Sequence, residues 1–234
     1  MDTVRGRGKG VGRVRRRVRR VVRRWMWVVG MVLMAMAPGA WARDVDGRLG
    51  VGLRAGGSFL SQDVDPGVEG NGGPMAGLHV FYGASNTRLL GVSIEWEGHQ
   101  IEQMDLACNG CDLGNAVVVS VLPTAHFRNL DLGNFVPYLS LGLGVNVNRF
   151  NESVRFSESC PGCTITPKHT VALKIGGGAD YFVTPNLALN GEWGWKVNAG
   201  ETKSDLRQVG RDRLTLRDYR LNTFSFLFGF RYFY

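Results

Sequence analysis

After residue 43 the chain lacks any apolar run of about 18 residues, the length that a helix needs to cross a bilayer. It also lacks the low hydrophobicity and extreme charge of disordered proteins, since 44% of its 234 residues are apolar and 10% are aromatic. These absences exclude a helical membrane span in the body and a disordered chain. The length suits one domain or two small ones.

The body also lacks the basic character that the net charge of +8 and the pI near 9.7 suggest for the whole chain. Residues 1–42 hold 11 Lys or Arg and one acidic residue, a net charge of +10. The other 192 residues hold 17 basic and 19 acidic side chains, a net charge of −2. A nucleic-acid-binding body therefore loses its main compositional support, and we expect no nucleic-acid partner.

The basic leader has the three parts of a secretory signal peptide. An arginine-rich stretch precedes a 13-residue apolar run over residues 25–37, which Pro38 ends, and Ala40-Trp41-Ala42 supplies small residues two apart. We predict a cleaved signal peptide over residues 1–42 and one exported domain over residues 43–234. A start at an internal methionine such as Met26 would leave a poor signal. A basic amphipathic helix lying on a membrane or on RNA is the alternative interpretation.

The body repeats a pattern of period two, with apolar residues on one face and Gly, polar or charged residues on the other. Residues 139–147, for example, place Leu or Val at every odd position and Ser, Gly or Asn at every even one. Such segments cover residues 48–59, 76–82, 90–97, 117–128, 139–148, 171–181, 187–197 and 223–234. They exceed the usual globular strand of about 5–6 residues and suit membrane-crossing strands of about 9–11 residues.

The connections between these segments alternate in length. Short turns at 85–88, 130–134 and 184–186 alternate with long polar segments at 61–73, 102–115, 151–168 and 198–218. This alternation is typical of an outer-membrane barrel. We predict an all-β fold, an eight-stranded antiparallel transmembrane up-and-down β-barrel. A soluble β-sandwich or a lipocalin-like barrel with the apolar face inside is the alternative. Aromatic residues near the predicted strand ends favour the membrane barrel: Trp96, Phe127, Tyr181, Trp195, Tyr232 and Tyr234.

Three stretches carry a family resemblance: residues 136–146, residues 178–189, and the ending Phe-Gly-Phe-Arg-Tyr-Phe-Tyr over residues 228–234. The chain resembles the small eight-stranded outer-membrane β-barrel proteins, grouped with the transmembrane domain of outer-membrane protein A and its X and W relatives. The resemblance implies a bacterial outer-membrane location among outer-membrane lipids and lipopolysaccharide, and the barrel-assembly machinery as partner during biogenesis. It also implies a C-terminal assembly signal made of Phe228, Phe230, Tyr232 and Tyr234.

The polar face of the predicted barrel carries charges of both signs. An eight-stranded barrel is just wide enough for side chains to fill it, and opposite charges inside should pair because an isolated buried ion is costly. We therefore predict a largely plugged, salt-bridged lumen, and a structural role with an unidentified surface ligand as partner. A narrow pore for small or apolar solutes, or a proton-sensitive path through His79 and His126, is the alternative. The predicted lumen charge network is Arg48, Arg54, Glu95, Glu97, Arg128, Lys174, Asp180, Glu192, Lys196 and Arg231.

The four cysteines form two closely spaced pairs, Cys108 with Cys111 and Cys160 with Cys163, in two of the long polar segments. Exported cysteines are usually oxidised, so we predict disulfides in surface loops, formed within or between the pairs. A four-thiolate zinc site and a redox-active pair are the alternatives.

Catalytic patterns are weak in this sequence. A lipid-modifying enzyme would pair a histidine with a serine, and neither His126 nor His169 has a serine two residues later. We expect no enzyme activity, no metal and no cofactor.

Overall fold

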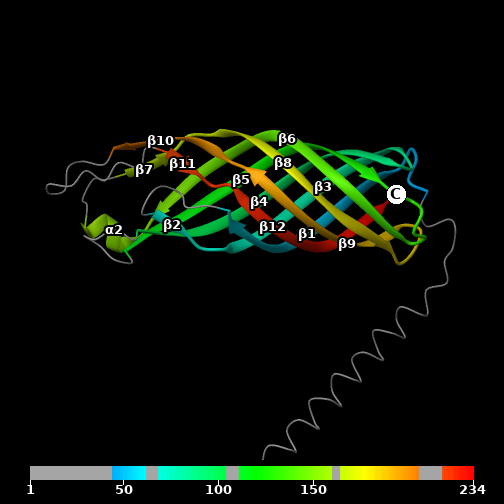
Figure 1. Ribbon diagram of the computed structural model, residues 1–234, viewed down its shortest axis with the longest axis horizontal. Coiled ribbons are helices and arrows are strands. Elements are labelled where there is room, and N and C mark those ends of the chain that lie inside the picture. Colours follow the sequence, from blue (N-terminus) through cyan, green and yellow to red (C-terminus); the bar gives the residue numbers. More distant parts are fainter. Residues whose placement is uncertain (1–43, 62–67, 104–110, 160–163, 206–217) are drawn as a thin grey trace, which may run out of the picture. The chain divides into compact units, whose positions relative to one another are not determined.

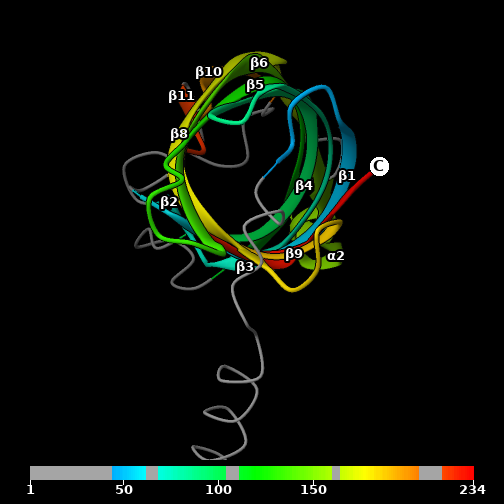
Figure 2. The same cartoon turned by 90° about the vertical axis from the view of Figure 1, so that its right-hand side faces the viewer.

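The computed structural model describes residues 44–61, 68–103, 111–159, 164–205 and 218–234. Eight antiparallel strands form a closed barrel, which Figure 2 shows as a ring. They are β1 (Leu49–Leu60), β3 (Gly73–Ser85), β4 (Arg88–Gln103), β5 (Cys111–Arg128), β6 (Phe135–Glu152), β8 (Thr170–Phe182), β9 (Leu187–Val197) and β12 (Thr223–Phe233). Each pairs with the next, and β12 pairs with β1 to close the ring. The predicted eight-stranded barrel is confirmed.

The two ends of the barrel differ. Short turns join β3 to β4, β5 to β6 and β8 to β9 at one end, called here the short-turn end, where the C-terminus also lies (Figure 1). At the opposite end, the long-loop end, β2 (Val68–Gly70) pairs with β4, and a short helix, α2 (Val154–Ser159), follows β6. A second sheet there contains β7 (Thr164–Pro167), β10 (Ala199–Asp205) and β11 (Asp218–Arg220). β2, α2, β7 and β10 fall in the segments predicted as polar loops, and β11 begins at the last residue of one of them. They were missed because such short elements show no periodic pattern.

The strands are unequal in length. β5 and β6 have 18 residues each and β4 has 16, whereas β9 and β12 have 11. The predicted segment on β4 ended too early, at residue 97, and the predicted segment on β5 began too late, at residue 117. The reason is that outward positions become polar toward the long-loop end, as at Gln100 and Asn115, while the backbone pairing of these two residues continues. The apolar alternation therefore fades before the strand ends.

The outer surface of the barrel is apolar. Leu139, Leu143 and Phe228 are 63%, 61% and 70% exposed, whereas Glu95 and Lys174 on the opposite face are 0% and 3% exposed. The alternative in which the Leu, Val and Phe face points inward is therefore wrong. This arrangement, with charged side chains inside and large apolar side chains outside, is typical of a barrel whose outer surface contacts membrane lipid.

Glycines on the inner face leave room for large lumen side chains. A Cβ atom added at Gly178 would lie 2.7 Å from the hydroxyl oxygen of Tyr138, and one added at Gly91 would lie 2.8 Å from Nε2 of His79. At Gly194 the added atom would lie 2.7 Å from Cε of Lys174. At Gly178 and Gly91 an added atom would also lie 2.2 and 2.3 Å from backbone oxygens of the neighbouring strands, so glycine at these positions avoids clashes both with the sheet and with lumen side chains.

The predicted signal peptide over residues 1–42, including the cleavage site at Ala42, lies outside the described residues. Within the ranges that the structure does describe, no helix combines the length and apolar character needed to cross a bilayer.

Candidate functional site: the charged lumen

Four charged side chains from different strands contact one another in the middle of the lumen. Lys174 on β8 donates hydrogen bonds from Nζ to Glu95 Oε1 on β4, at 2.5 Å, and to Glu192 Oε1 on β9, at 2.8 Å. Arg54 on β1 donates to the same two carboxylates, to Glu95 at 3.2 Å and also to Glu192. Each cation thus contacts both carboxylates. We call these four residues the ion quartet; it joins four strands through the centre of the barrel and its formal charges cancel.

A second layer lies toward the short-turn end. Arg231 on β12 donates from Nη1 to Asp180 Oδ2 at 2.9 Å and from Nη2 to the Tyr138 hydroxyl at 3.1 Å, and its guanidinium lies 4.6 Å from the centre of the Tyr138 ring. The Tyr138 hydroxyl donates in turn to Glu192 Oε2 at 2.9 Å. His126 stacks on Tyr138 with ring centres 4.7 Å apart. Tyr138 therefore links this layer to the ion quartet.

A third layer lies toward the long-loop end. Lys196 on β9 donates from Nζ to Ser120 Oγ at 2.8 Å and pairs with Glu97 Oε1 at 2.7 Å. His99, 1% exposed, lies 3.7 Å from Glu97 Oε2 and 3.3 Å from Ser58 Oγ. Together the three layers place four buried cations beside four buried carboxylates, so the lumen holds no large excess of either charge.

Apolar clusters cover both ends of the charged layers. At the short-turn end seven side chains pack together: Val45, Phe81, Leu89, Val136, Phe182, Ala188 and Phe233. At the long-loop end the cluster consists of Ile101, Leu113, Ala116, Val118, Phe156, Ile165 and Leu221, so that α2 and β7 each contribute one side chain. The charged layers thus lie between two clusters of buried apolar side chains.

Two residues of the predicted charge network lie apart from it, at the short-turn end. The guanidinium of Arg48 donates to the backbone carbonyls of Phe233 at 2.8 Å and Tyr234 at 3.1 Å. Arg128 donates to the backbone carbonyl of Asn86 at 2.8 Å. Arg48 lies just before β1 begins, and the buried guanidinium of Arg128 lies 5.6 Å from the centre of the Phe182 ring. The other eight predicted residues come together in the three layers.

Sequence reasoning missed several lumen residues. His99 was missed because the third predicted segment ended at residue 97, although the same period-two spacing continues through His99 to Ile101. Tyr138 was missed because the predicted segment began at residue 139, although the same period-two spacing runs back through Tyr138 to Val136. Asn148 and Asn198 form reciprocal side-chain hydrogen bonds at 3.3 and 2.8 Å near the long-loop end, across 50 residues of sequence that no local pattern connects.

The remaining predicted site residues are only partly described. Cys108, Cys160 and Cys163 lie outside the described residues, and of Cys111 only the backbone, at the start of β5, is described. Phe228, Phe230, Tyr232 and Tyr234 all face outward and are 39–70% exposed. In the described part of the chain no group of three or more His, Cys, Asp or Glu side chains could hold a metal ion.

Comparison with known proteins identifies the fold through structure alone. No protein-family model and no curated sequence matches the chain. The outer membrane protein OprG of Pseudomonas aeruginosa superposes with a TM-score of 0.66 at 13% identity, over 81% of this chain and 96% of OprG. Neisserial surface protein A, NspA, superposes with a TM-score of 0.50 at 13% identity, over 79% of this chain and 96% of NspA. The chain thus has the fold of the small eight-stranded outer-membrane β-barrel proteins.

Proposed function

We propose that this protein is an exported barrel of a bacterial outer membrane that keeps its lumen closed and acts through its outer surface. The exposed apolar side chains around the ring and the fold shared with OprG and NspA support the location. In this proposal the protein is not an enzyme. Its partners are outer-membrane lipids and lipopolysaccharide, the assembly machinery during biogenesis, and a surface ligand.

The ion quartet is the observation that carries the proposal of a closed lumen. Lys174 and Arg54 each bridge two carboxylates whose strands, β4 and β9, lie on opposite sides of the ring, so a solute moving along the axis would have to break several buried charge-assisted hydrogen bonds at once. Breaking one buried pair typically costs about 3–5 kcal/mol. The apolar clusters above and below add two further barriers.

The elaborate long-loop end supports the surface role. There α2 and the sheet of β7, β10 and β11 extend beyond the barrel (Figure 1), whereas the short-turn end has only tight connections. One of these tight connections, the turn between β5 and β6 at the short-turn end, contains Gly133 with a φ angle of +69°, a backbone conformation that glycine adopts at little cost. Loops on a rigid scaffold are the usual place for binding residues.

A narrow polar path is the second candidate. It is favoured by buried polar atoms that have no hydrogen-bond partner among the described residues, namely Arg54 Nε, His79 Nδ1 and Glu95 Oε2. Atoms of this kind are often satisfied by water, which a conducting lumen would contain.

Planar-bilayer conductance separates the two candidates. The full chain would be purified from outer membranes and accepted only if boiled and unboiled samples migrate differently on a gel. We expect folded protein to give no unitary current steps. Reproducible steps in wild type that change in size in Lys174→Met would overturn the closed-lumen proposal and support the narrow path.

A further inference from the structure

One hydrogen bond in the second layer of the lumen joins opposite walls of the barrel. Arg231 on β12 donates from Nη2 to Nδ1 of His126 on β5, at 3.2 Å. In the closed ring β1, β3 and β4 lie between these two strands on one side, and β6, β8 and β9 lie between them on the other. The contact therefore spans the full width of the lumen.

The direction of this hydrogen bond determines where His126 carries its proton. A guanidinium has N–H donors and no acceptor, so Nδ1 of His126 is the acceptor and bears no proton. An imidazolium carries a proton on both ring nitrogens and has no acceptor left. The contact between Arg231 and His126 therefore exists only while His126 is neutral.

Two neighbouring rings hold His126 in this orientation. Tyr138 stacks on it with ring centres 4.7 Å apart and 10° between the ring planes, and His79 stacks on it at 4.9 Å and 28°. Nε2 of His79 in turn lies 3.0 Å from Oγ1 of Thr124. His126 and His79 are 2% and 1% exposed. The His126 imidazole thus cannot turn away from Arg231 toward water unless both rings repack.

The carboxylates of this part of the lumen already have partners. Glu192 on β9 accepts hydrogen bonds from Lys174 and Arg54 of the ion quartet, and also from the Tyr138 hydroxyl. Asp180 on β8 accepts from Arg231. Glu95 on β4 is likewise bonded to Lys174 and Arg54. Each of these carboxylates is thus engaged by a cation, and a proton on His126 would have to share one of them.

Cations surround the same ring. Arg231, Arg54 and Lys174 all lie close enough to His126 to oppose a positive charge on it. Arg128, two residues later on β5, is a further buried cation. A proton on His126 would therefore remove the acceptor of Arg231 and place a second positive charge directly against its guanidinium.

We propose that the contact between Arg231 and His126 is a pH-sensitive latch, which joins β12 to β5 at neutral pH and opens when His126 takes up a proton. A histidine in an unfolded chain takes up a proton below about pH 6.5. The unfolded chain can therefore bind this proton, whereas the closed latch cannot. It follows that the free energy of unfolding should fall as the pH falls below about 6.5, and that this group has no such effect at higher pH.

The test compares urea unfolding of wild type and His126→Gln in detergent micelles, on full chains purified from outer membranes, at about pH 7.5 and about pH 5.5. The carbonyl of Gln can still accept a hydrogen bond from Arg231, but it does not titrate. Uptake of one proton on unfolding raises the unfolding equilibrium constant about tenfold per pH unit. We therefore expect acidification to raise this constant about tenfold more in wild type than in His126→Gln. His169→Gln, which replaces an exposed histidine at the long-loop end, is the matched control and should respond like wild type.

Nitrogen NMR of folded wild type provides a readout that a merely structural histidine would not give. If His126 becomes charged while the barrel is folded, the Arg231 side-chain resonances must shift with the same midpoint, because the guanidinium loses its acceptor. An imidazole that stays neutral until the barrel unfolds also supports the latch, since the closed contact excludes the proton.

Two results would overturn the latch. One is an equal response of wild type and His126→Gln to acid, and the other is a charged His126 beside unchanged Arg231 resonances. If His126→Gln does not fold, as the gel mobility of unboiled samples would reveal, the NMR titration of wild type decides alone. Conductance at neutral pH tests the closed lumen separately, so the two proposals can fail independently.

Discussion

Lys174 and Glu95 meet across the lumen, with Nζ 2.5 Å from Oε1, although their strands, β8 and β4, are not neighbours in the sheet. Most contacts in a barrel join adjacent strands. A contact between strands on different sides of the ring instead holds the cross-section of the barrel together from inside. Substitutions in the ion quartet should therefore lower the stability of the whole barrel.

Replacing Lys174 by Met should lower the free energy of unfolding by about 3–5 kcal/mol, because it leaves two buried carboxylates with one shared cation. Adding Glu192→Gln to this variant should recover part of the loss, since a carboxylate without its cation is then removed. Urea unfolding in detergent micelles measures both effects. A loss below 1 kcal/mol for Lys174→Met would show that the quartet contributes little to stability.

Arg48→Gln should loosen the seam at which β12 closes onto β1. The Arg48 guanidinium donates to the carbonyls of Phe233 and Tyr234, and hydrogen bonds from charged groups are typically worth about 1.5–3 kcal/mol when buried, less at this half-buried site. We expect faster hydrogen exchange at the last residues of β12. Arg88→Gln, an exposed arginine at the same end, serves as the control. Equal exchange in the two variants would contradict this role of Arg48.

Gly178→Ala should destabilise the barrel by about 1–3 kcal/mol through overpacking. The added methyl group would lie 2.2 Å from the backbone oxygen of Gly191 and 2.7 Å from the Tyr138 hydroxyl, which Asn190, Arg231 and Glu192 hold in place. Gly191→Ala is the matched control, because its added atom meets the Phe228 ring at an ordinary 3.5 Å. The prediction concerns the difference between the two unfolding free energies, and a control as unstable as Gly178→Ala would refute it.

Mass mapping under non-reducing conditions should find no free thiol at Cys108, Cys111, Cys160 or Cys163, since we expect the closely spaced cysteines of an exported protein to form disulfides. The peptides that remain linked after proteolysis will reveal whether the pairs form within or between the loops. Recovery of four alkylatable cysteines would instead favour a metal site.

The alternation of residue types predicted which side chains face the lumen, because successive side chains of a strand point to opposite faces. Arg54, Glu95 and Glu192 are buried on the face that this alternation indicates. Which of them would meet was not predictable, because Arg54 and Glu192 are 138 residues apart in sequence and their relative height depends on the stagger of the whole barrel. Arg48 was included in the network for the same reason: its position along the barrel axis could not be predicted, and it lies at the end of the barrel.

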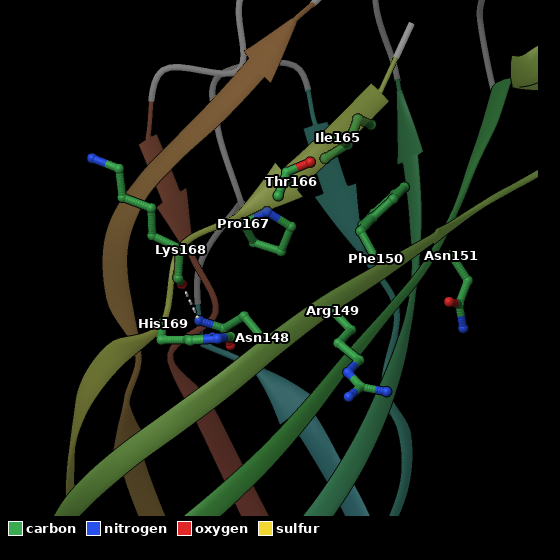
Figure 3. A pocket seen from close by; sticks show the side chains of 9 residues that line it. All are labelled: Asn148, Arg149, Phe150, Asn151, Ile165, Thr166, Pro167, Lys168 and His169. Atoms are coloured by element: carbon green, nitrogen blue, oxygen red, sulfur yellow. Dashed lines mark hydrogen bonds between the residues drawn. The ribbon is translucent and has the colours of Figure 1, made fainter. Parts of the chain in front are cut away.

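The small sheet at the long-loop end was missed for a different reason. Its β7 is a strand of four residues within a segment predicted as a loop. Hydrogen bonds from Asn148 to the Lys168 carbonyl (Figure 3) and from the Ile165 N–H to Glu152 attach this segment to β6, and no local pattern in the sequence indicates either contact.

The unequal strand lengths have a consequence for the height of the barrel wall. Eleven residues, as in β9 and β12, rise about 28 Å along the axis of a barrel with a tilt of about 40°, close to an apolar band about 25 Å tall. Eighteen residues, as in β5 and β6, rise about 45 Å. β5 and β6 would then be about 17 Å longer along the axis than β9 and β12. On the β9 and β12 side the wall is instead continued by β10, which follows β9 directly and pairs with β11 and β7. The two sides thus reach beyond the apolar band by different means, one through uninterrupted strands and the other through a separate small sheet.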